Sequence, residues 1–236
     1  MKTKLLTSVA CAAMMVAGTA SAYTISDTYY GSNDHGLGDR IGSSTFEVHG
    51  MDVSFAGGFM DVTVYTNYIN GTLSTTFGDL FISTNGWAPF GSAPYLSDNA
   101  SNGEVWEFVF DTSANKLVGG AFGTVLSSGP SGSTWRDGQE VLRAGGTGSE
   151  FSDGSSVDLT GACPGSGCGS IKYHINMASL GYDSINDPGI GLHWAMTCAN
   201  DVIEGGVKVP EPGTLALLGL SLVGISAARI SRKARS

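Results

Sequence analysis

Residues 59–69 read FMDVTVYTNYI, and this stretch decides the fold class. Two sets of side chains alternate along it, one apolar (Met60, Val62, Val64) and one polar or aromatic (Asp61, Thr63, Tyr65). Successive side chains of a β-strand point to opposite faces, so this alternation predicts a strand that turns one face to a core.

The same signal recurs along the chain. Phe46 and Val48 alternate, as do Met51, Val53 and Phe55. Further short runs of this kind read DLFIS, VWEFVFD, KLVGGAF, IKYHINM and IGLHWAMTC. Turn-forming Gly, Ser, Asn and Asp separate them, and no window of the body shows helical periodicity. We therefore predict an all-β fold, an antiparallel β-sandwich of jelly-roll-like type with about eight to ten strands.

The N-terminus has the features of a secretory signal peptide. Lys2 and Lys4 precede an apolar run over residues 5–18, and residues 20–22 read ASA, a small-x-small cleavage site. The apolar run is too short to span a bilayer comfortably. We predict that residues 1–22 are removed.

The body that remains, residues 23–208, is strongly acidic. It holds six Lys or Arg against twenty Asp or Glu, a formal net charge of −14, whereas the whole chain carries −9. Such a field repels nucleic acid and anionic lipid headgroups and suits cations or neutral ligands. The length allows a single domain with a substantial core.

The tail, residues 209–236, combines three features in a fixed order. A Pro-Glu-Pro motif comes first (Val209, Pro210, Glu211, Pro212), then an apolar segment over about residues 214–230, then a basic cluster (Arg229, Arg232, Lys233, Arg235). The apolar segment is about 25 Å long as a helix, enough for a thin bilayer, so we predict a single transmembrane helix. The cations then stay in the cytoplasm and the body lies outside. The prolines favour an extended segment just outside the membrane.

This order of features resembles the PEP-CTERM sorting signal of exopolysaccharide-producing Gram-negative bacteria. The resemblance implies cleavage near Pro-Glu-Pro by an exosortase, a membrane transpeptidase-like enzyme. The precursor is then anchored transiently in the inner membrane, with its body in the periplasm, before it reaches the cell surface or extracellular matrix. The same tail is also labelled an ice-binding protein C-terminal domain, a label that implies no ice binding by the body. A permanent single-span anchor is the alternative.

Phrases of the body also resemble those of other exported PEP-CTERM proteins of unknown activity. They read YYGSNDHGLGD, FGDLFISTNGW, GEVWEFVFD and LHWAMTCANDVIEG. This resemblance transfers no catalytic residue.

The body shows no local catalytic signature. It lacks the Gly-x-Ser-x-Gly, Ser-x-x-Lys and cysteine-protease patterns. Glu104 and Glu107 lie three residues apart on a predicted strand, so they point to opposite faces and form no local glycosidase pair. The histidines are dispersed, lack the zinc motif His-Glu-x-x-His, and are interpreted as surface or hydrogen-bonded residues (His35, His49, His174, His193).

A glycine-rich acidic loop, GSNDHGLGD at residues 31–39, suggests a calcium site. Asn33, Asp34 and Asp39 would supply oxygen ligands on a flexible backbone, as a hard cation requires. The spacing does not match an EF-hand, and the alternative is that these residues only form turns. Calcium is the one cofactor for which the sequence offers ligands.

Trp87, in NGWAPFG, is the best candidate for stacking on a sugar ring. Its alternative role is to anchor its own loop.

The cysteines divide into three groups. Cys11 leaves with the signal peptide. Cys163 and Cys168 flank a short Pro- and Gly-containing loop, CPGSGC, and we predict a disulfide between them in an oxidising periplasm. Cys198 alternates with Trp194 and Met196 and is predicted to be a buried free thiol.

These features lead to two functional hypotheses. We expect a non-enzymatic protein of the cell envelope or exopolysaccharide matrix, with a binding or structural role and with polysaccharide among its partners. The alternative is a secreted hydrolase that acts on polysaccharide, because glycosidase carboxylates leave little local signature.

Overall fold

The protein is seen in a computed structural model that describes residues 21–68, 71–122, 135–143, 148–162, 168–182 and 188–210. Ala22–Val209 form one compact unit. Within the described residues no helix is both long and apolar enough to cross a bilayer. The predicted transmembrane helix and basic cluster lie outside these residues.

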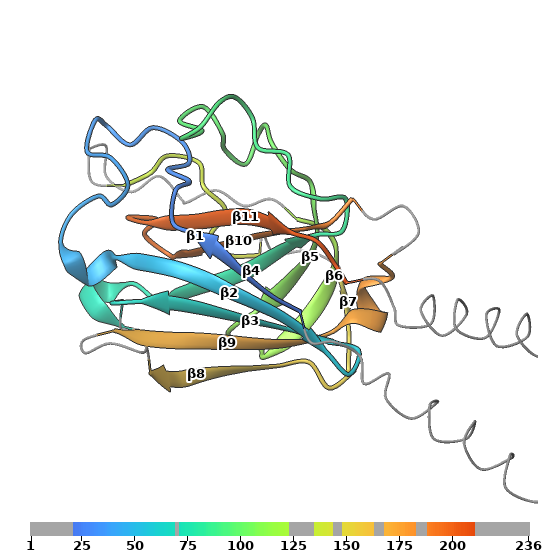
Figure 1. Cartoon of the computed structure of the whole chain (residues 1–236). Helices are drawn as coiled ribbons and strands as arrows, with labels where there is room; N and C mark the ends of the chain where they lie inside the picture. The colour runs from blue at the N-terminus through green and yellow to red at the C-terminus, as the bar shows by residue number, and fades with distance from the viewer. Residues whose placement is uncertain are drawn as a thin grey trace, which may run out of the picture. The chain divides into compact units, whose positions relative to one another are not determined.

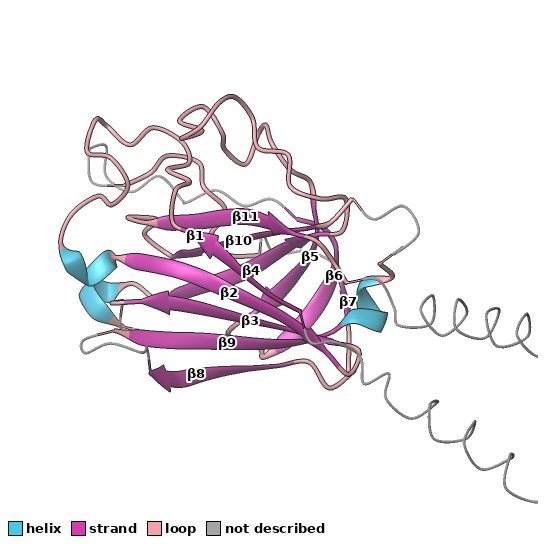
Figure 2. Cartoon of the chain, viewed as in Figure 1, coloured by secondary structure: helices cyan, strands magenta, loops and turns pink. Residues whose placement is uncertain are grey.

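Two antiparallel sheets make up the body (Figures 1 and 2). The five-stranded sheet has the order β1 (Ser21–Ser26), β2 (Val48–Ala56), β3 (Phe59–Thr66), β9 (Gly169–Asn176), β8 (Ser156–Ala162). The six-stranded sheet has the order β11 (Val202–Val207), β10 (Ile190–Met196), β4 (Phe77–Ser83), β5 (Trp106–Asp111), β6 (Lys116–Phe122), β7 (Ser149–Glu150). The described helical turns are short 3₁₀ segments, Ser44–Phe46, Thr72–Ser74 and Met177–Leu180.

The strand order confirms the predicted sandwich. β3 pairs with β9 in one sheet, and the strands that follow them, β4 and β10, pair in the other. The segments β3–β4 and β9–β10 therefore cross from the five-stranded to the six-stranded sheet as neighbours. This paired crossing gives the fold its jelly-roll-like character. The described strands number eleven, one more than the upper end of the prediction, and the shortest of them is β7, with two residues.

The main core lies between the sheets. Val53, Val62 and Ile171 of the five-stranded sheet belong to one buried cluster. The six-stranded sheet contributes large apolar side chains from β4 and β10 to the same cluster (Leu80, Ile82, Leu192, Trp194). The six-stranded sheet is buried on its outer face as well, where a second cluster contains Phe81, Trp106 and Val109. Loops from residues 27–47 and 84–105 lie on the β10–β11 side of the molecule (Figure 1).

A bulge in β2 explains a change of phase in its sequence pattern. Val48 is buried, but the alternation then moves from even to odd positions at Met51 and Val53. The register with β3 shifts between Val48 and Gly50. Gly50 has a φ of 150°, which glycine adopts readily, so one extra residue is accommodated here.

Candidate metal centre

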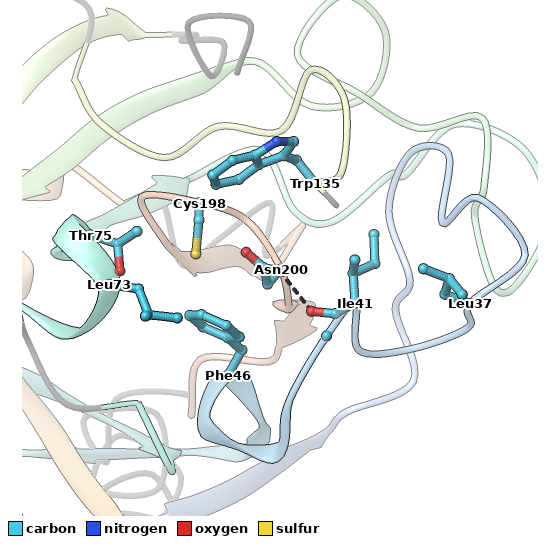
Figure 3. A pocket seen from close by; sticks show the side chains of 9 residues that line it. Leu37, Ile41, Phe46, Leu73, Thr75, Trp135, Cys198 and Asn200 are labelled. Carbon is cyan, nitrogen blue, oxygen red and sulfur yellow. Dashed lines mark hydrogen bonds between the residues drawn. The ribbon is translucent and has the colours of Figure 1, made fainter. Parts of the chain in front are cut away.

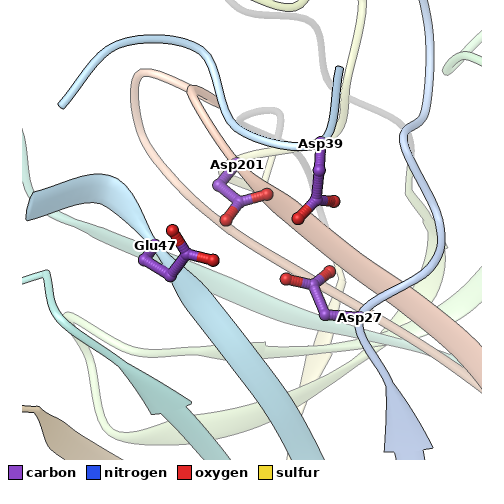
Figure 4. A group of neighbouring side chains, drawn as sticks. All are labelled: Asp27, Asp39, Glu47 and Asp201. Carbon is purple, nitrogen blue, oxygen red and sulfur yellow. The ribbon is translucent and has the colours of Figure 1, made fainter. Parts of the chain in front are cut away.

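Four carboxylates from separate parts of the chain converge at one end of the sandwich (Figure 4). Asp27 directly follows β1, Asp39 lies in the loop after it, Glu47 directly precedes β2, and Asp201 directly precedes β11. One oxygen from each lies within 4.8 Å of the others. We refer to these four residues as the four-carboxylate cluster.

Asp201 is fixed by backbone donors at the centre of this arrangement. It is fully buried, and its Oδ2 accepts a hydrogen bond of 2.7 Å from the Val48 N–H. Its Oδ1 accepts a 3.0 Å bond from the Val202 N–H. The start of β2 and the start of β11 are thereby tied to the same side chain.

Asp27 and Asp39 differ from Asp201 in their partners. Both oxygens of Asp27, and Oδ1 of Asp39, are buried without a hydrogen-bond partner in the described residues. A buried ionised oxygen without a donor or cation is costly, because it has lost its water. These three oxygens therefore need either a proton or a cation.

Two arginines offset part of the negative charge. Arg40 forms an ion pair with Glu47. Arg136 is fully buried, donates to the carbonyls of Tyr30 and Gly38, and attracts the carboxylates of the cluster. If all four carboxylates are ionised, these two cations leave a formal charge of −2.

Burial sets the proton affinity of the cluster. It raises the pKa of Asp27 and of Asp201 well above the usual range, and repulsion from other carboxylates of the cluster adds to the shift. The pKa of Asp39 is raised by burial too, although Arg136 and Arg40 oppose this. The cluster is thus partly protonated near neutral pH unless a cation replaces the protons.

Only one member of the predicted calcium set joins this cluster. Asp39 does so, whereas Asp34 accepts hydrogen bonds from the N–H groups of Gly36 and Gly38 at 2.9 and 3.0 Å. Asn33 accepts one from the His35 N–H. These bonds correspond to the turn-forming alternative for Asn33 and Asp34.

A second group of carboxylates comes from the loop between β4 and β5 and from β11. Asp98, Glu104 and Glu204 also have oxygens within 4.8 Å of one another, and we call them the three-carboxylate cluster. The Tyr29 hydroxyl donates to Asp98 at 2.8 Å, and the Trp87 indole N–H donates to Glu204 at 2.8 Å. Side-chain donors thus reach Asp98 and Glu204, whereas no donor among the described residues reaches either oxygen of Asp27.

Protons complete the three-carboxylate cluster. Burial and then repulsion from neighbouring carboxylates raise the pKa of Glu104 and of Glu204 to about 8. Oε2 of Glu104 has no partner among the described groups when it is ionised, but a protonated Glu104 hydrogen-bonds to Glu204. With a pKa of about 8, each of these two carboxyls favours its protonated form at neutral pH.

His193 continues this network on the neighbouring strand. It lies opposite Glu204 in the β10–β11 register, and its Nδ1 is 2.8 Å from Glu204 Oε2. Nε2 is 2.7 Å from the Glu140 carbonyl, which can only accept, so Nε2 carries a hydrogen. His193 is fully buried and hydrogen-bonded, and His174 bonds to Asp61, in agreement with the interpretation from sequence.

The structure places Trp87 in a loop-anchoring position. Besides its bond to Glu204, its ring contacts Tyr95 edge-on with centroids 5.5 Å apart. The side chain is half-buried. These contacts fit the second of the two roles predicted for Trp87.

The cysteines are partly described. Cys198 is a buried free thiol, as predicted, and burial raises its pKa. Cys168 is disulfide-bonded. Its predicted partner Cys163 lies outside the described residues, so the pairing stays a prediction.

Beyond β11 the described chain ends at Pro210, with Val209 and Pro210 half-buried. A family model for the PEP-CTERM protein-sorting motif matches residues 208–233. The chain carries a PEP-CTERM sorting motif. This motif implies an exported protein that is processed by an exosortase and associates with a membrane during sorting. Neither the curated proteins nor the solved structures provide a match to the chain.

The PEP-CTERM motif says nothing of the body's chemistry, which depends on its cavities and carboxylates. One cavity of about 350 Å³ is lined by Phe46, Trp135 and other uncharged residues. Another, shallower and of about 590 Å³, includes Glu107 as its one carboxylate among Thr84, Phe108 and neighbouring residues. Glu104 lies before β5, not on the strand predicted for it, and Glu104 and Glu107 have separate partners, Ala88 and Thr84. Neither of these two cavities presents the facing carboxylates of a glycosidase.

Proposed function

We propose that this exported protein belongs to the cell envelope or exopolysaccharide matrix, holds calcium in its body, and acts by association rather than by catalysis. The observation that carries the proposal is the four-carboxylate cluster, with three buried oxygens that have no partner in the described residues. The sorting motif supplies the setting, outside the cytoplasmic membrane.

The geometry of the cluster supports calcium in three ways. Calcium–oxygen distances of about 2.3–2.6 Å place two ligands of one ion at most about 5 Å apart, and the four oxygens lie within 4.8 Å. The formal charge of −2 that remains after the arginines equals the charge needed to balance a divalent cation. All donors are oxygens, which suits a hard cation better than zinc.

The route of export is part of the proposal. Residues 1–22 act as a signal peptide, and residues 214–230 insert transiently with the body outside. Cleavage after Ala22 leaves Tyr23–Ser26 of β1, including the buried Ile25. Protease added to spheroplasts is expected to digest the body while a cytoplasmic marker survives. Protection of the body would contradict this topology.

The non-enzymatic role is the part of the proposal that binding and activity assays test together. Purified body should co-sediment with the native polysaccharide of the producing cell, more strongly in calcium than in chelator, and release no reducing sugar. The matched variants Asp27→Asn and Glu104→Gln each change one of the two carboxylate clusters. Only Asp27→Asn should remove the calcium dependence of co-sedimentation. Release of reducing sugar that one carboxylate substitution abolishes would establish the hydrolase alternative instead.

A further inference from the structure

The cavity of about 350 Å³ has an uncharged lining (Figure 3), and Ile41, Phe46 and Asn200 in that lining lie within two positions in sequence of acids of the four-carboxylate cluster. Six of its lining residues carry the argument (Ile41, Phe46, Leu73, Trp135, Cys198, Asn200). They come from the loops before β2 and before β4, the segment around residue 135, and the turn between β10 and β11. We refer to this cavity as the apolar pocket.

The wall of the apolar pocket is held in place by hydrogen bonds. The Ile41 N–H donates to the Asn200 carbonyl at 2.7 Å, and the Asn200 side-chain amide donates to the Ile41 carbonyl at 2.7 Å. Two distant loops are thus joined by a reciprocal pair of bonds, one of which is drawn in Figure 3. A wall fixed in this way is preformed, which lowers the cost of binding a ligand.

Leu73, at the pocket, is an unusual residue in two respects. Its side chain is 72% exposed, the largest exposed fraction among the exposed large apolar residues described. Its φ of 53° and ψ of 35° place a non-glycine residue in the left-handed region, and Ser74 follows with a φ of 63°. Strain of this kind is retained where the conformation has a use, and ligand clamps are among the places where it gathers.

We propose that the apolar pocket binds a small, neutral, apolar molecule, with Leu73 closing over it. The volume is at the lower end of that of small-molecule sites and too small for a folded partner. The lining contains no charged residue, so an anionic group would lose its water there without gaining a cationic partner. The proposal does not depend on the calcium site.

The test uses the body, residues 22–209, which forms one compact unit with its own core. The probe is N-phenyl-1-naphthylamine, and its matched control is 1-anilinonaphthalene-8-sulfonate, which adds a sulfonate to the same ring system. We expect saturable binding of the neutral dye with one site per chain, energy transfer from tryptophan, and at least tenfold weaker binding of the sulfonate.

Two readouts locate the bound dye. Leu73→Gln should weaken binding about tenfold, whereas Leu159→Gln, which changes an exposed leucine on β8, should leave it unchanged. Saturating dye should slow the alkylation of Cys198 by N-ethylmaleimide at least fivefold, as measured by mass spectrometry.

Absence of saturable binding would overturn the proposal, as would unchanged Cys198 alkylation in the presence of bound dye. Equal dye affinity in Leu73→Gln and the unaltered body would do the same. If Leu73→Gln lowers the thermal midpoint of unfolding, its dye affinity is not used. The alkylation of Cys198 in the unaltered body then decides whether the dye binds in the apolar pocket. Repeating the titration in chelator keeps this result separate from that of the calcium site.

Discussion

The two groups of carboxylates in the body are built from the same residue types but have different surroundings. In the three-carboxylate cluster, Tyr29, Trp87 and His193 supply side-chain partners to Asp98 and Glu204. In the four-carboxylate cluster, the side-chain donors described around the acids are arginines, and Arg136 directs its described bonds to backbone carbonyls instead.

This difference shows what distinguishes a hydrogen-bond network from a candidate metal centre. Both groups are within ligand distance of a common point and both contain buried oxygens, so proximity alone does not separate them. The separating property is how many buried oxygens lack a donor among the described residues, three in the four-carboxylate cluster and one, Glu104 Oε2, in the other. Neither side-chain oxygen of Asp27 has a hydrogen-bond donor among the described residues, and this marks the candidate metal centre.

The largest expected effect is on calcium-dependent stability. At a calcium concentration a hundredfold above Kd, the body should gain about 2.7 kcal/mol in its free energy of unfolding. Asp27→Asn should lose most of this gain, because it replaces two anionic ligand oxygens with one neutral oxygen. Thermal unfolding in calcium and in chelator measures the difference. Glu104→Gln is the control, and loss of the gain there would reverse the assignment of the two clusters.

A somewhat smaller effect concerns pH in the absence of calcium. The folded pKa of Glu104 and Glu204 is about 8, above the ordinary value, so the folded body keeps protons that the unfolded chain has lost. The resulting stability is full below the unfolded pKa and is lost as the pH rises through about 8. With allowance for the partial exposure of Glu104, we expect a loss on the order of 2 kcal/mol between about pH 5 and pH 8.5.

Chemical denaturation across this pH range measures the slope of the free energy of unfolding against pH. Glu104→Gln should reduce it, because glutamine has no carboxyl group to titrate. Glu150→Gln, which changes an exposed glutamate paired with Lys116, should leave it unchanged. An unaltered slope in Glu104→Gln would mean that protonation of Glu104 does not stabilise the folded body.

Proton release should accompany calcium binding. Burial raises the pKa of Asp27 and Asp201, so calcium must displace protons from them near neutral pH. For each proton released, Kd should fall about tenfold per pH unit, equivalent to about 1.4 kcal/mol. Calorimetry in two buffers with different ionisation enthalpies counts the protons. Binding without proton release would show that the cluster is already ionised.

The smallest expected effect tests the donor side of the comparison. Trp87→Phe keeps the ring against Tyr95 but removes the N–H that donates to Glu204, which should lower the free energy of unfolding by about 1 kcal/mol. The calcium-dependent gain should be unchanged. Tyr65→Phe, which removes a hydrogen bond to the half-exposed Asp52, serves as the control and should cost less. Equal losses of unfolding free energy in the two variants would indicate that the Trp87–Glu204 bond stabilises the body no more than the Tyr65–Asp52 bond does.

The strands were predictable from sequence because their signal is local. In β3 the buried and half-buried residues alternate along the whole strand, as in the sequence pattern. The phase change in β2 was visible as a pattern, but its cause, the bulge at Gly50, needed the pairing with β3.

The candidate metal centre was only partly predictable because it is assembled over long distances in the chain. Asp39 was identified from its glycine-rich loop, but Asp201 comes from the opposite end of the body. Asp27, Glu47 and Asp201 do share one signal, an acidic residue directly next to a strand end. Which strand ends meet depends on the sheet topology, and residue types alone do not give it.

The reciprocal bonds between Ile41 and Asn200 have a further consequence. Each of these residues is within two positions of an acid of the four-carboxylate cluster, Asp39 and Asp201. The same two stretches of backbone therefore carry acids of the four-carboxylate cluster and form a wall of the apolar pocket. By thermodynamic linkage, any molecule that binds the pocket more tightly in the calcium-bound body must raise the affinity for calcium by the same factor.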